Sequence, residues 1–322
     1  MDLTPTEKQR AVLTNSDSVT FDSQGEPIAG RLFPAAFGSG PAAAVAILGP
    51  MTFQKEQAPA RYAERLSRLG FTTLIFDPRY RGESGGLPRC YENPAAKAAD
   101  LTAALDYLAG RDDIDANRMA VLGICMGAGH VLPVAADNPL VGAVAAITGH
   151  YRDPAADAAW LGGADAVGER LARGVAARSA YQQTGEVEYV PAVDAERPDV
   201  GMPGELVWGW YQLAADRDQW ENRYAVLSDE AVFSFETLSV AARLHTPLLM
   251  MHGDLCAVPE AARRHYAVVP TADKRLVWDD RTRHLQYYDD PAVIDRAVWE
   301  IADWFATHLS ARLRADSDVR PA

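Results

Sequence analysis

The most constraining feature of the sequence is an abrupt change from a strand pattern to a helix pattern around Cys125. The apolar run Met119 to Leu122 has the length of a buried strand, and Ala128 to Ala136 has helical character, with almost no connector between them. Gly123 and Gly127 stand two residues before and two residues after the cysteine. Because so tight a turn brings two backbones together, glycine is needed where a Cβ atom would collide. The stretch therefore predicts a strand, a sharp turn and a helix, with Cys125 at the turn.

A cysteine at such a turn is expected to project above the end of the sheet, close to the positive end of the following helix. That position favours the thiolate, which is the reactive form of cysteine. The pattern G-x-C-x-G is that of a nucleophile elbow with cysteine as the nucleophile. The alternative is a small buried side chain at a glycine-rich turn, because free cysteine is often buried. The strand before the turn, the helix after it and a histidine downstream favour covalent catalysis by Cys125.

Length and composition indicate one large folded unit. The chain has 322 residues, of which 48% are hydrophobic, and this fits an α/β domain with an insertion better than two equal domains. No apolar run reaches the length needed to span a membrane, and the first residues lack a basic head followed by an apolar stretch. We therefore expect a protein that is not exported and that resides in the cytoplasm.

The cysteines and the net charge argue against several kinds of site. Cys90, Cys125 and Cys256 are widely scattered and lack the spacing of metal ligands, so neither a disulfide framework nor a zinc site is expected. The formal net charge of -13 disfavours nucleic acid and anionic membrane surfaces as partners, because both need clustered lysine and arginine. A small molecule is the expected partner, and a homodimer is possible.

The order of the apolar runs predicts an α/β fold with a mainly parallel twisted sheet and helices on both of its faces. Residues 18–21 and 28–33 flank a turn and are expected to form an antiparallel hairpin. Strand and helix patterns then alternate, which is typical of parallel strands joined by helical crossovers. The expected strands are 43–48, 71–76, 119–122, 141–148, 247–252 and 275–278, and the expected helices are 59–69, 94–108, 128–136, 155–161, 164–181, 259–266 and 291–309.

The regular alternation is interrupted in the middle of the chain, which suggests the following domain organisation. Residues 1–17 form an N-terminal arm, residues 18–151 and 241–310 form the core, residues 152–240 form an inserted helical lid, and residues 311–322 form a tail. The lid is rich in aromatic residues, most of which are expected to form its own core. A minority facing the turn, for which we select Trp208, Trp210 and Tyr211, would form an apolar substrate pocket.

His284 is the expected base for Cys125. It lies between the last strand and the last helix, in a loop that returns to the carboxyl ends of the strands, where the turn at Cys125 also points. The order of cysteine before histidine matches the nucleophile-first order of hydrolases with this elbow. His130 and His252 are interpreted as helix-face and packed histidines, and His150 is left undecided.

The residue that would orient His284 is less certain from the sequence. The orienting acid commonly follows the penultimate strand, and Cys256 stands at its usual place. Asp254 lies two residues earlier and is equally well explained as the orienting acid or as a turn residue. Asp229 and Glu230 of the insertion are further candidates. A thiol needs this acid less than a hydroxyl does, because it ionises more easily.

Two backbone N–H groups are expected to stabilise the oxyanion that forms when Cys125 attacks a carbonyl carbon. One belongs to Met126, and the other comes from the loop that follows strand 43–48. Because Pro50 has no N–H, either Met51 or Thr52 must supply it.

Beyond these separate signals, most of the chain resembles the α/β-hydrolase superfamily, and it is most similar to the dienelactone-hydrolase-like branch. The motifs that carry the resemblance are residues 123–127, the Lys55-Glu56 loop, Asp77-x-Arg79 through Ser84, and the stretches 149–152 and 278–289. The resemblance implies a site of the Cys-His-Asp type at Cys125 and His284, with no metal and no organic cofactor. It also implies ester, lactone or thioester substrates. Glu56 and Arg79 are added to the predicted substrate pocket. Tyr80, where the family usually has glycine, and Cys256 depart from the pattern.

Three functions are compatible with the sequence. The leading hypothesis is a cysteine-dependent acyl hydrolase that works through a covalent acyl-enzyme. The second is non-hydrolytic use of the same site for lactonisation, cyclisation, elimination or acyl transfer in natural-product biosynthesis, because an acyl-enzyme kept dry can be captured by another nucleophile. The third is a binding protein that retained the fold without catalysis.

Overall fold

A computed structural model of the chain describes residues 15–215 and 220–318. Most of the predicted N-terminal arm, residues 1–14, lies outside this part of the chain, as do the last four residues of the tail. Within the described residues, no helix combines the length and the apolar character that crossing a membrane requires.

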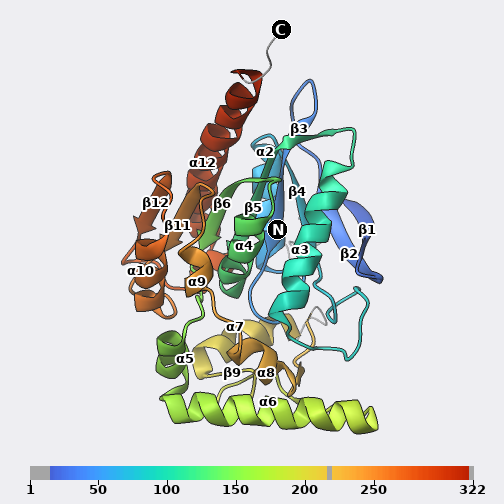
Figure 1. Cartoon of the computed structure of the whole chain (residues 1–322), viewed down its shortest axis with the longest axis vertical. Coiled ribbons are helices and arrows are strands. Elements are labelled where there is room, and N and C mark those ends of the chain that lie inside the picture. The colour runs from blue at the N-terminus through green and yellow to red at the C-terminus, as the bar shows by residue number, and fades with distance from the viewer. Residues whose placement is uncertain (1–14, 216–219, 319–322) are drawn as a thin grey trace, which may run out of the picture.

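The centre of the protein is an eight-stranded sheet in the order β1-β2-β4-β3-β5-β6-β11-β12 (Figure 1). The hairpin β1–β2 is antiparallel, β2 is antiparallel to β4, and the remaining neighbours are parallel. The mainly parallel sheet and the opening hairpin are therefore as predicted. The strands are β1 (Asp17–Ser23), β2 (Glu26–Phe33), β3 (Ala42–Leu48), β4 (Phe71–Phe76), β5 (Ile114–Ile124), β6 (Val141–Ile147), β11 (Leu248–His252) and β12 (Lys274–Trp278).

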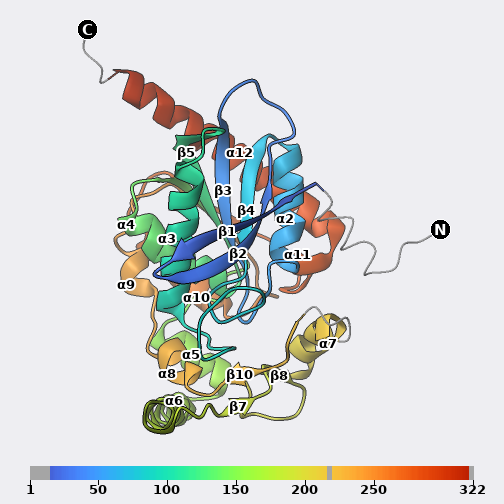
Figure 2. The same ribbon diagram turned by 90° about the vertical axis from the view of Figure 1, so that its right-hand side faces the viewer.

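Helices cover both faces of the sheet. Figure 2 shows strands β3 and β4 between α3 on one side and α2 on the other. Side chains alternate along each strand, so Leu122 and Ile124 of β5 join the core beneath α2 and α12, whereas Val121 joins the core beneath α3, α4 and α10. The core helices are α2 (Ala58–Arg68), α3 (Pro94–Ala109), α4 (Met126–Asp137), α10 (Pro259–Val268), α11 (Gln286–Asp289) and α12 (Pro291–Asp318).

Two element boundaries differ by five residues or more from the sequence-based expectation. Strand β5 begins at Ile114, five residues before the expected start at Met119, because its polar first half still pairs through Ile114 with Ala42 of β3. Helix α12 continues to Asp318, although its apolar pattern ends near Leu309 and a frayed tail was expected from residue 311. In both cases the backbone continues a regular element beyond the apolar run that predicted it.

The segment between β6 and β11 lies outside the layers of the sheet. Figure 1 shows α6 as its outermost helix, with α5, α7 and α8 between α6 and the sheet. The carboxylate of Asp229, which is fully buried, accepts hydrogen bonds from Arg170 at 2.7 and 2.8 Å and also pairs with Arg173. This segment contains α5 (Pro154–Leu161), α6 (Ala164–Thr184), β7 (Tyr189–Val190), β8 (Val193–Asp194), β9 (Met202–Pro203), α7 (Glu205–Ala215), β10 (Tyr224–Ala225), α8 (Ser228–Phe233) and α9 (Leu238–Ala241).

The turn between β5 and α4 is possible because of the two glycines that flank Cys125. A Cβ atom on Gly123 would lie 2.4 Å from the carbonyl oxygen of Gly127. A Cβ atom on Gly127 would lie 2.3 Å from the carbonyl oxygen of Leu48 and 2.6 Å from that of Gly49. These neighbours are backbone atoms, which cannot move aside as a side chain could. The start of α4 therefore packs against the end of β3 only if both positions are glycine.

Replacing Gly127 by alanine should lower the free energy of unfolding by about 3 kcal/mol or more, because the added methyl group overlaps two carbonyl oxygens. Chemical denaturation followed by circular dichroism measures this change. The matched control is Gly168→Ala, at an exposed helical glycine where an added Cβ would have nothing within 4 Å. That substitution should raise stability by up to about 1 kcal/mol. Equal stability of Gly127→Ala and the wild type would contradict the close packing.

Candidate functional site

Cys125 occupies a strained backbone conformation at the predicted turn. Its φ and ψ angles are 56° and -122°, outside the regions that non-glycine residues usually adopt. Backbone hydrogen bonds hold the conformation: the N–H of Cys125 donates to the carbonyl of Ile147 at 3.0 Å, and the Cys125 carbonyl accepts from His150 N–H at 3.0 Å. The turn is thus tied to strand β6 and to the residues that follow it. Strain of this kind is typical of functional sites.

The Cys125 sulfur lies among hydrogen-bond donors. Burial raises the pKa of the thiol, while the hydroxyl of Tyr288 and the backbone N–H groups of Met126 and Met51 lower it in part by hydrogen bonding to the sulfur. The buried ammonium group of Lys97 acts in the same direction from a greater distance. Cys125 itself is only 6% exposed. The structure therefore brings together the predicted nucleophile and two of the predicted oxyanion donors.

The loop after β3 is held so that Met51, rather than Thr52, directs its N–H toward the cysteine. The Thr52 N–H donates to a carboxylate oxygen of buried Glu92 at 3.2 Å. The carbonyl oxygens of the two loop residues accept hydrogen bonds from the segment between β6 and β11: Tyr211 donates to Met51 at 2.9 Å, and Trp220 donates to Thr52 at 2.6 Å. Of the two alternatives left open by the sequence, the geometry thus favours Met51.

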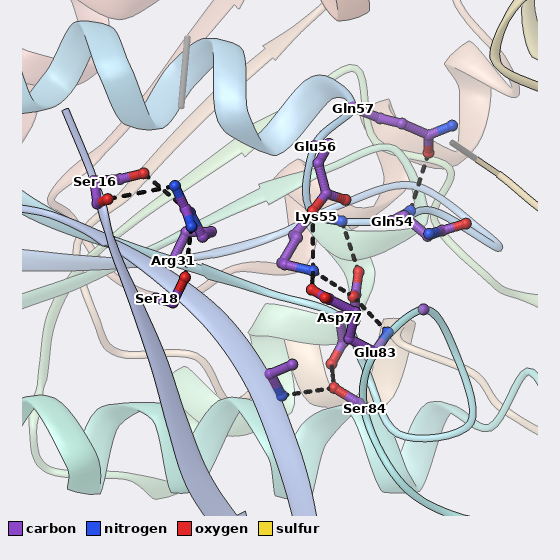
Figure 3. Close-up of polar contacts among 12 residues, drawn as sticks. Ser16, Ser18, Arg31, Gln54, Lys55, Glu56, Gln57, Asp77, Glu83 and Ser84 are labelled. Atoms are coloured by element: carbon purple, nitrogen blue, oxygen red, sulfur yellow. Dashed lines mark hydrogen bonds and ion pairs between the residues drawn. The ribbon is translucent and has the colours of Figure 1, made fainter. Parts of the chain in front are cut away.

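The same loop is anchored by a group of charges around the buried pair Lys55 and Asp77, shown in Figure 3. The Lys55 ammonium group contacts carboxylate oxygens of Asp77 at 2.7 Å, Glu83 at 2.5 Å and Glu56 at 2.9 Å. Burial lowers the pKa of Lys55, but the charges of Asp77 and Glu56 outweigh it and raise the pKa overall. Glu56 is therefore the partner of a lysine, and it does not line the cavity that contains Cys125.

His284 reaches the cysteine through Tyr288. Its Nε2 atom lies 2.9 Å from the Tyr288 hydroxyl, which in turn contacts the Cys125 sulfur. On the other side of the ring, Nδ1 lies 2.8 Å from the Thr148 hydroxyl and accepts a hydrogen bond from the Ala257 N–H at 3.2 Å. Burial, with a smaller contribution from His252, lowers the pKa of His284 to about 3. The imidazole is thus neutral at physiological pH.

These contacts fix which nitrogen of His284 carries the proton. A backbone N–H can only donate, so Nδ1, which faces the Ala257 N–H, must be the acceptor. The single proton of the neutral ring is then on Nε2, and it is donated to the Tyr288 oxygen. The Tyr288 hydroxyl is left to donate its own proton toward the Cys125 sulfur.

None of the predicted acids orients His284 in the structure. Asp254 has a side chain that is 51% exposed and pairs with Arg263 at 2.5 Å, so it acts as a surface ion pair. Asp229 is bonded to the arginines of α6, and Glu230 pairs with Arg178. Cys256, at the usual place of the acid, hydrogen-bonds to the Thr148 hydroxyl rather than to the ring. The hypothesis that Asp254 completes the site is therefore not supported, because the loop directs its carboxylate to solvent.

A cavity of about 230 Å³ opens next to the Cys125 sulfur. Burial lowers the pKa of both its histidines far enough to leave them neutral, so no lining side chain carries a charge at neutral pH. Leu206 and Leu255 are at its edge, 64% and 49% exposed. The lining residues are Cys125, His150, Trp160, Met202, Leu206, Val207, Tyr211, Leu255, Cys256, Ala257, His284, Leu285 and Tyr288.

The predicted pocket residues fall into different places. Tyr211 lines the cavity, whereas Trp210 packs edge-on against the Tyr288 ring at 5.0 Å and donates to Asp289 at 2.8 Å from outside the cavity. Trp208 is a half-buried part of the core and does not line the cavity. Arg79 is also absent from the lining, because its guanidinium group pairs with buried Asp100 at 2.9 Å. Arg79 in the Asp77-x-Arg79 motif thus stabilises the fold through this ion pair and does not form part of the cavity wall.

The sequence interpretation missed Tyr288 and Thr148. Tyr288 is four residues after His284, the spacing that places two side chains on the same side of a helical turn, and this signal could have indicated it. Thr148 was recognised only as the end of a strand. Its contact with His284 joins residues 136 positions apart in the chain, so no local sequence pattern could predict the contact.

Comparisons with known proteins agree with this geometry. Residues 60–162 match the Dienelactone hydrolase family. The chain is 26% identical to the uncharacterized protein YcjY of Escherichia coli (strain K12) over 261 residues, 79% of this chain and 85% of the relative. It is 26% identical to the acyltransferase drtE of Aspergillus calidoustus over 247 residues, 72% of this chain and 76% of the relative. A protein named thiohydrolase from Eupenicillium brefeldianum is 33% identical over 121 residues, 38% of each chain.

Solved structures share the same architecture. The structure of DcsB in complex with its substrate analogue superposes with a TM-score of 0.77 at 18% identity, over 91% of this chain and 99% of that chain. At this identity the likeness establishes the fold alone. Together with the sheet order and the turn at Cys125, it shows that the chain has the α/β-hydrolase fold, and within this fold residues 60–162 match the Dienelactone hydrolase family.

Proposed function

We propose that the protein is a cysteine-dependent acyl hydrolase that forms a covalent acyl-enzyme on Cys125. The observation that carries the proposal is the position of the Cys125 sulfur between the N–H groups of Met126 and Met51, beside the hydroxyl of Tyr288. Donors that surround the attacking atom also surround the oxygen of the carbonyl it attacks, so they can stabilise the negative charge that develops there.

The first step transfers an acyl group to sulfur. The Cys125 sulfur forms a bond to the carbonyl carbon, and the bond from this carbon to the leaving atom breaks. The thiol proton passes to the Tyr288 oxygen, while Tyr288 gives its own proton to the leaving atom, so the tyrosine ends as it began. His284 assists by donating from Nε2 to the Tyr288 oxygen, which makes the tyrosine a better proton donor. Water then attacks the acyl carbon and the bond from this carbon to sulfur breaks. One proton of the water passes through Tyr288 to the Cys125 sulfur, and the acid is released.

The cavity indicates the kind of acyl group. Its lining carries no charge at neutral pH, so an ionised acid would enter without a partner, at a high cost in desolvation. An uncharged, apolar acyl group fits this lining, and Leu206 and Leu255 extend the apolar surface to the mouth. Because a neutral imidazole gives little help to a poor leaving group, thioesters and activated esters suit the site better than alkyl esters.

Acyl transfer to a nucleophile other than water is the second candidate. It is favoured by the neutral contacts of His284, whose Nδ1 faces a hydroxyl and a backbone N–H where a carboxylate would strengthen the base. Because Nε2 of His284 carries the proton and cannot act as a base, and because the cavity is apolar, water is poorly activated and the acyl-enzyme lasts longer. The similarity to an acyltransferase over most of the chain is consistent with this reaction. Product mass separates the two reactions, since hydrolysis alone adds water to the acyl group.

Replacing Cys125 by alanine should abolish turnover of an apolar acyl thioester and also the acyl adduct seen by mass spectrometry of the intact protein, because the attacking atom is gone. The matched control is Cys90→Ala, which removes another buried thiol that does not line the cavity. Cys90→Ala should keep both the adduct and the turnover. Equal turnover by Cys125→Ala and the wild type would exclude covalent catalysis at this position.

Replacing Tyr288 by phenylalanine should reduce kcat by about 100-fold or more, because it removes the hydroxyl that carries the proton from Cys125 to the leaving atom and keeps the ring. Steady-state kinetics with the same thioester measures the change. Tyr151→Phe is the control, since the described structure shows no hydrogen-bond partner for the buried Tyr151 hydroxyl. An unchanged kcat in Tyr288→Phe would show that protons take another path.

The pH dependence should lack the usual histidine inflection. His284 stays neutral above a pKa of about 3, and burial raises the pKa of the Cys125 thiol, so neither group titrates between about pH 5.5 and about pH 8. We expect kcat/KM to be nearly constant over this range and to rise in more alkaline buffer as the thiol ionises. A tenfold change centred near the ordinary pKa of histidine, in protein that circular dichroism shows to be folded, would contradict the neutral imidazole.

A further inference from the structure

Thr148 is held in a backbone conformation that threonine rarely adopts. It follows β6 directly, its φ angle is +44°, and its side chain is fully buried. A β-branched residue in the left-handed region is strained, because its branched Cβ crowds the backbone. The Thr148 N–H donates to the carbonyl of Met251 at 2.7 Å, which keeps the residue in this position. Such strain persists where the surrounding structure imposes it, and it concentrates at functional sites.

The strained backbone brings the Thr148 hydroxyl to the imidazole of His284. The distance from Oγ1 to Nδ1 is 2.8 Å. Because the Ala257 N–H already requires Nδ1 to accept, the Thr148 hydroxyl is also a donor to this nitrogen. The Cys256 sulfur lies beside this hydroxyl and donates its own hydrogen bond to the Thr282 carbonyl at 3.8 Å. Thr148 thus contacts the ring, although Cys256 stands at the place in the sequence where an acid was expected.

Resting on the proposed function, we propose that Thr148 is a positioning residue that takes the place of the catalytic acid and keeps the proton of His284 on Nε2. The hydrogen bonds then run in one direction, from Thr148 to Nδ1 of His284, and from Nε2 through Tyr288 to Cys125. A carboxylate at the same place would accept a proton from Nδ1 and favour a charged ring. A hydroxyl that donates has the opposite effect, so this site presents a proton donor to Tyr288.

The tautomer of His284 provides a direct test that needs no substrate. Nitrogen NMR of histidine-labelled protein should show Nδ1 as the unprotonated nitrogen and Nε2 as the protonated one in the wild type. A protonated Nδ1 would overturn the inference, whatever the activity of the enzyme. Conversely, if Cys125→Ala kept full turnover but the expected tautomer was found, the proposed function would fail and the assignment of Thr148 would stand.

Variants of Thr148 test its hydroxyl. Thr148→Val should shift the Nδ1 resonance and lower kcat about tenfold with little change in KM, because the ring loses one of the two donors that hold it. Thr148→Ser, which keeps the hydroxyl, should restore both. The matched control is Thr237→Val, since the hydroxyl of Thr237 lies 2.8 Å from Nε2 of buried His265 in the same kind of pair. Thr237→Val should leave the His284 resonances and kcat unchanged; equal effects of the two valine variants would reduce Thr148 to a structural role.

A carboxylate at position 148 should have the opposite effect on the proton of His284 to that of the Thr148 hydroxyl. Thr148→Asp should move the proton of His284 to Nδ1 and raise its pKa, because the carboxylate accepts from the ring and stabilises its charged form. Aspartate also tolerates the left-handed backbone better than threonine does. The pH profile of kcat/KM should then gain an inflection between about pH 5 and about pH 8 that the wild type lacks. A profile that stays flat in a folded Thr148→Asp protein would contradict the proposed role.

Discussion

The candidate site depends on the positive φ angle of one non-glycine residue, Cys125. An angle of this kind costs on the order of 1–3 kcal/mol, and the packing around it must offset that cost. Two contacts provide this offset. The carbonyl of Ile147 in strand β6 accepts a hydrogen bond from the Cys125 N–H, and Gly127 packs closely against the end of β3. The conformation lifts the sulfur out of the sheet and turns the Met126 N–H toward it. Without the strained angle, the thiol would be a buried side chain in a strand.

Burial keeps the titratable groups that line the cavity neutral at physiological pH. It raises the pKa of the Cys125 thiol and the Tyr288 hydroxyl, and it lowers the pKa of His150 and His284. A thiolate and imidazolium pair would need compensation that the cavity does not contain, because the contacts of His284 are neutral groups. Hydrogen bonds between neutral groups therefore hold these side chains in place, and in the proposed reaction charge develops only when a substrate carbonyl is attacked.

The sequence predicted those parts of the fold and the site that depend on local pattern. The strand, turn and helix around Cys125 are encoded by neighbouring residues, and the alternation of apolar runs led to the parallel sheet. Arg79 was assigned to the pocket after its motif had been matched to the family resemblance, but its partner Asp100 lies on a helix whose position relative to the motif follows only from the packed fold. Thr148 could not be predicted for the same reason, since its partner is brought to it by the order of the strands.

The charged groups near the site lie outside the cavity, and this separation has a physical reason. The Met51 N–H can stabilise an oxyanion only if its loop does not move, and Asp77 and Lys55 fix the end of that loop with hydrogen bonds of 2.7 and 2.9 Å. An ion pair that excludes water costs desolvation unless each of its atoms is satisfied, and Asp77 meets this condition by also accepting the Glu83 N–H at 3.0 Å. The rigidity of the loop thus comes from charges that never meet the substrate. The cavity itself keeps the low polarity that makes two backbone N–H groups effective.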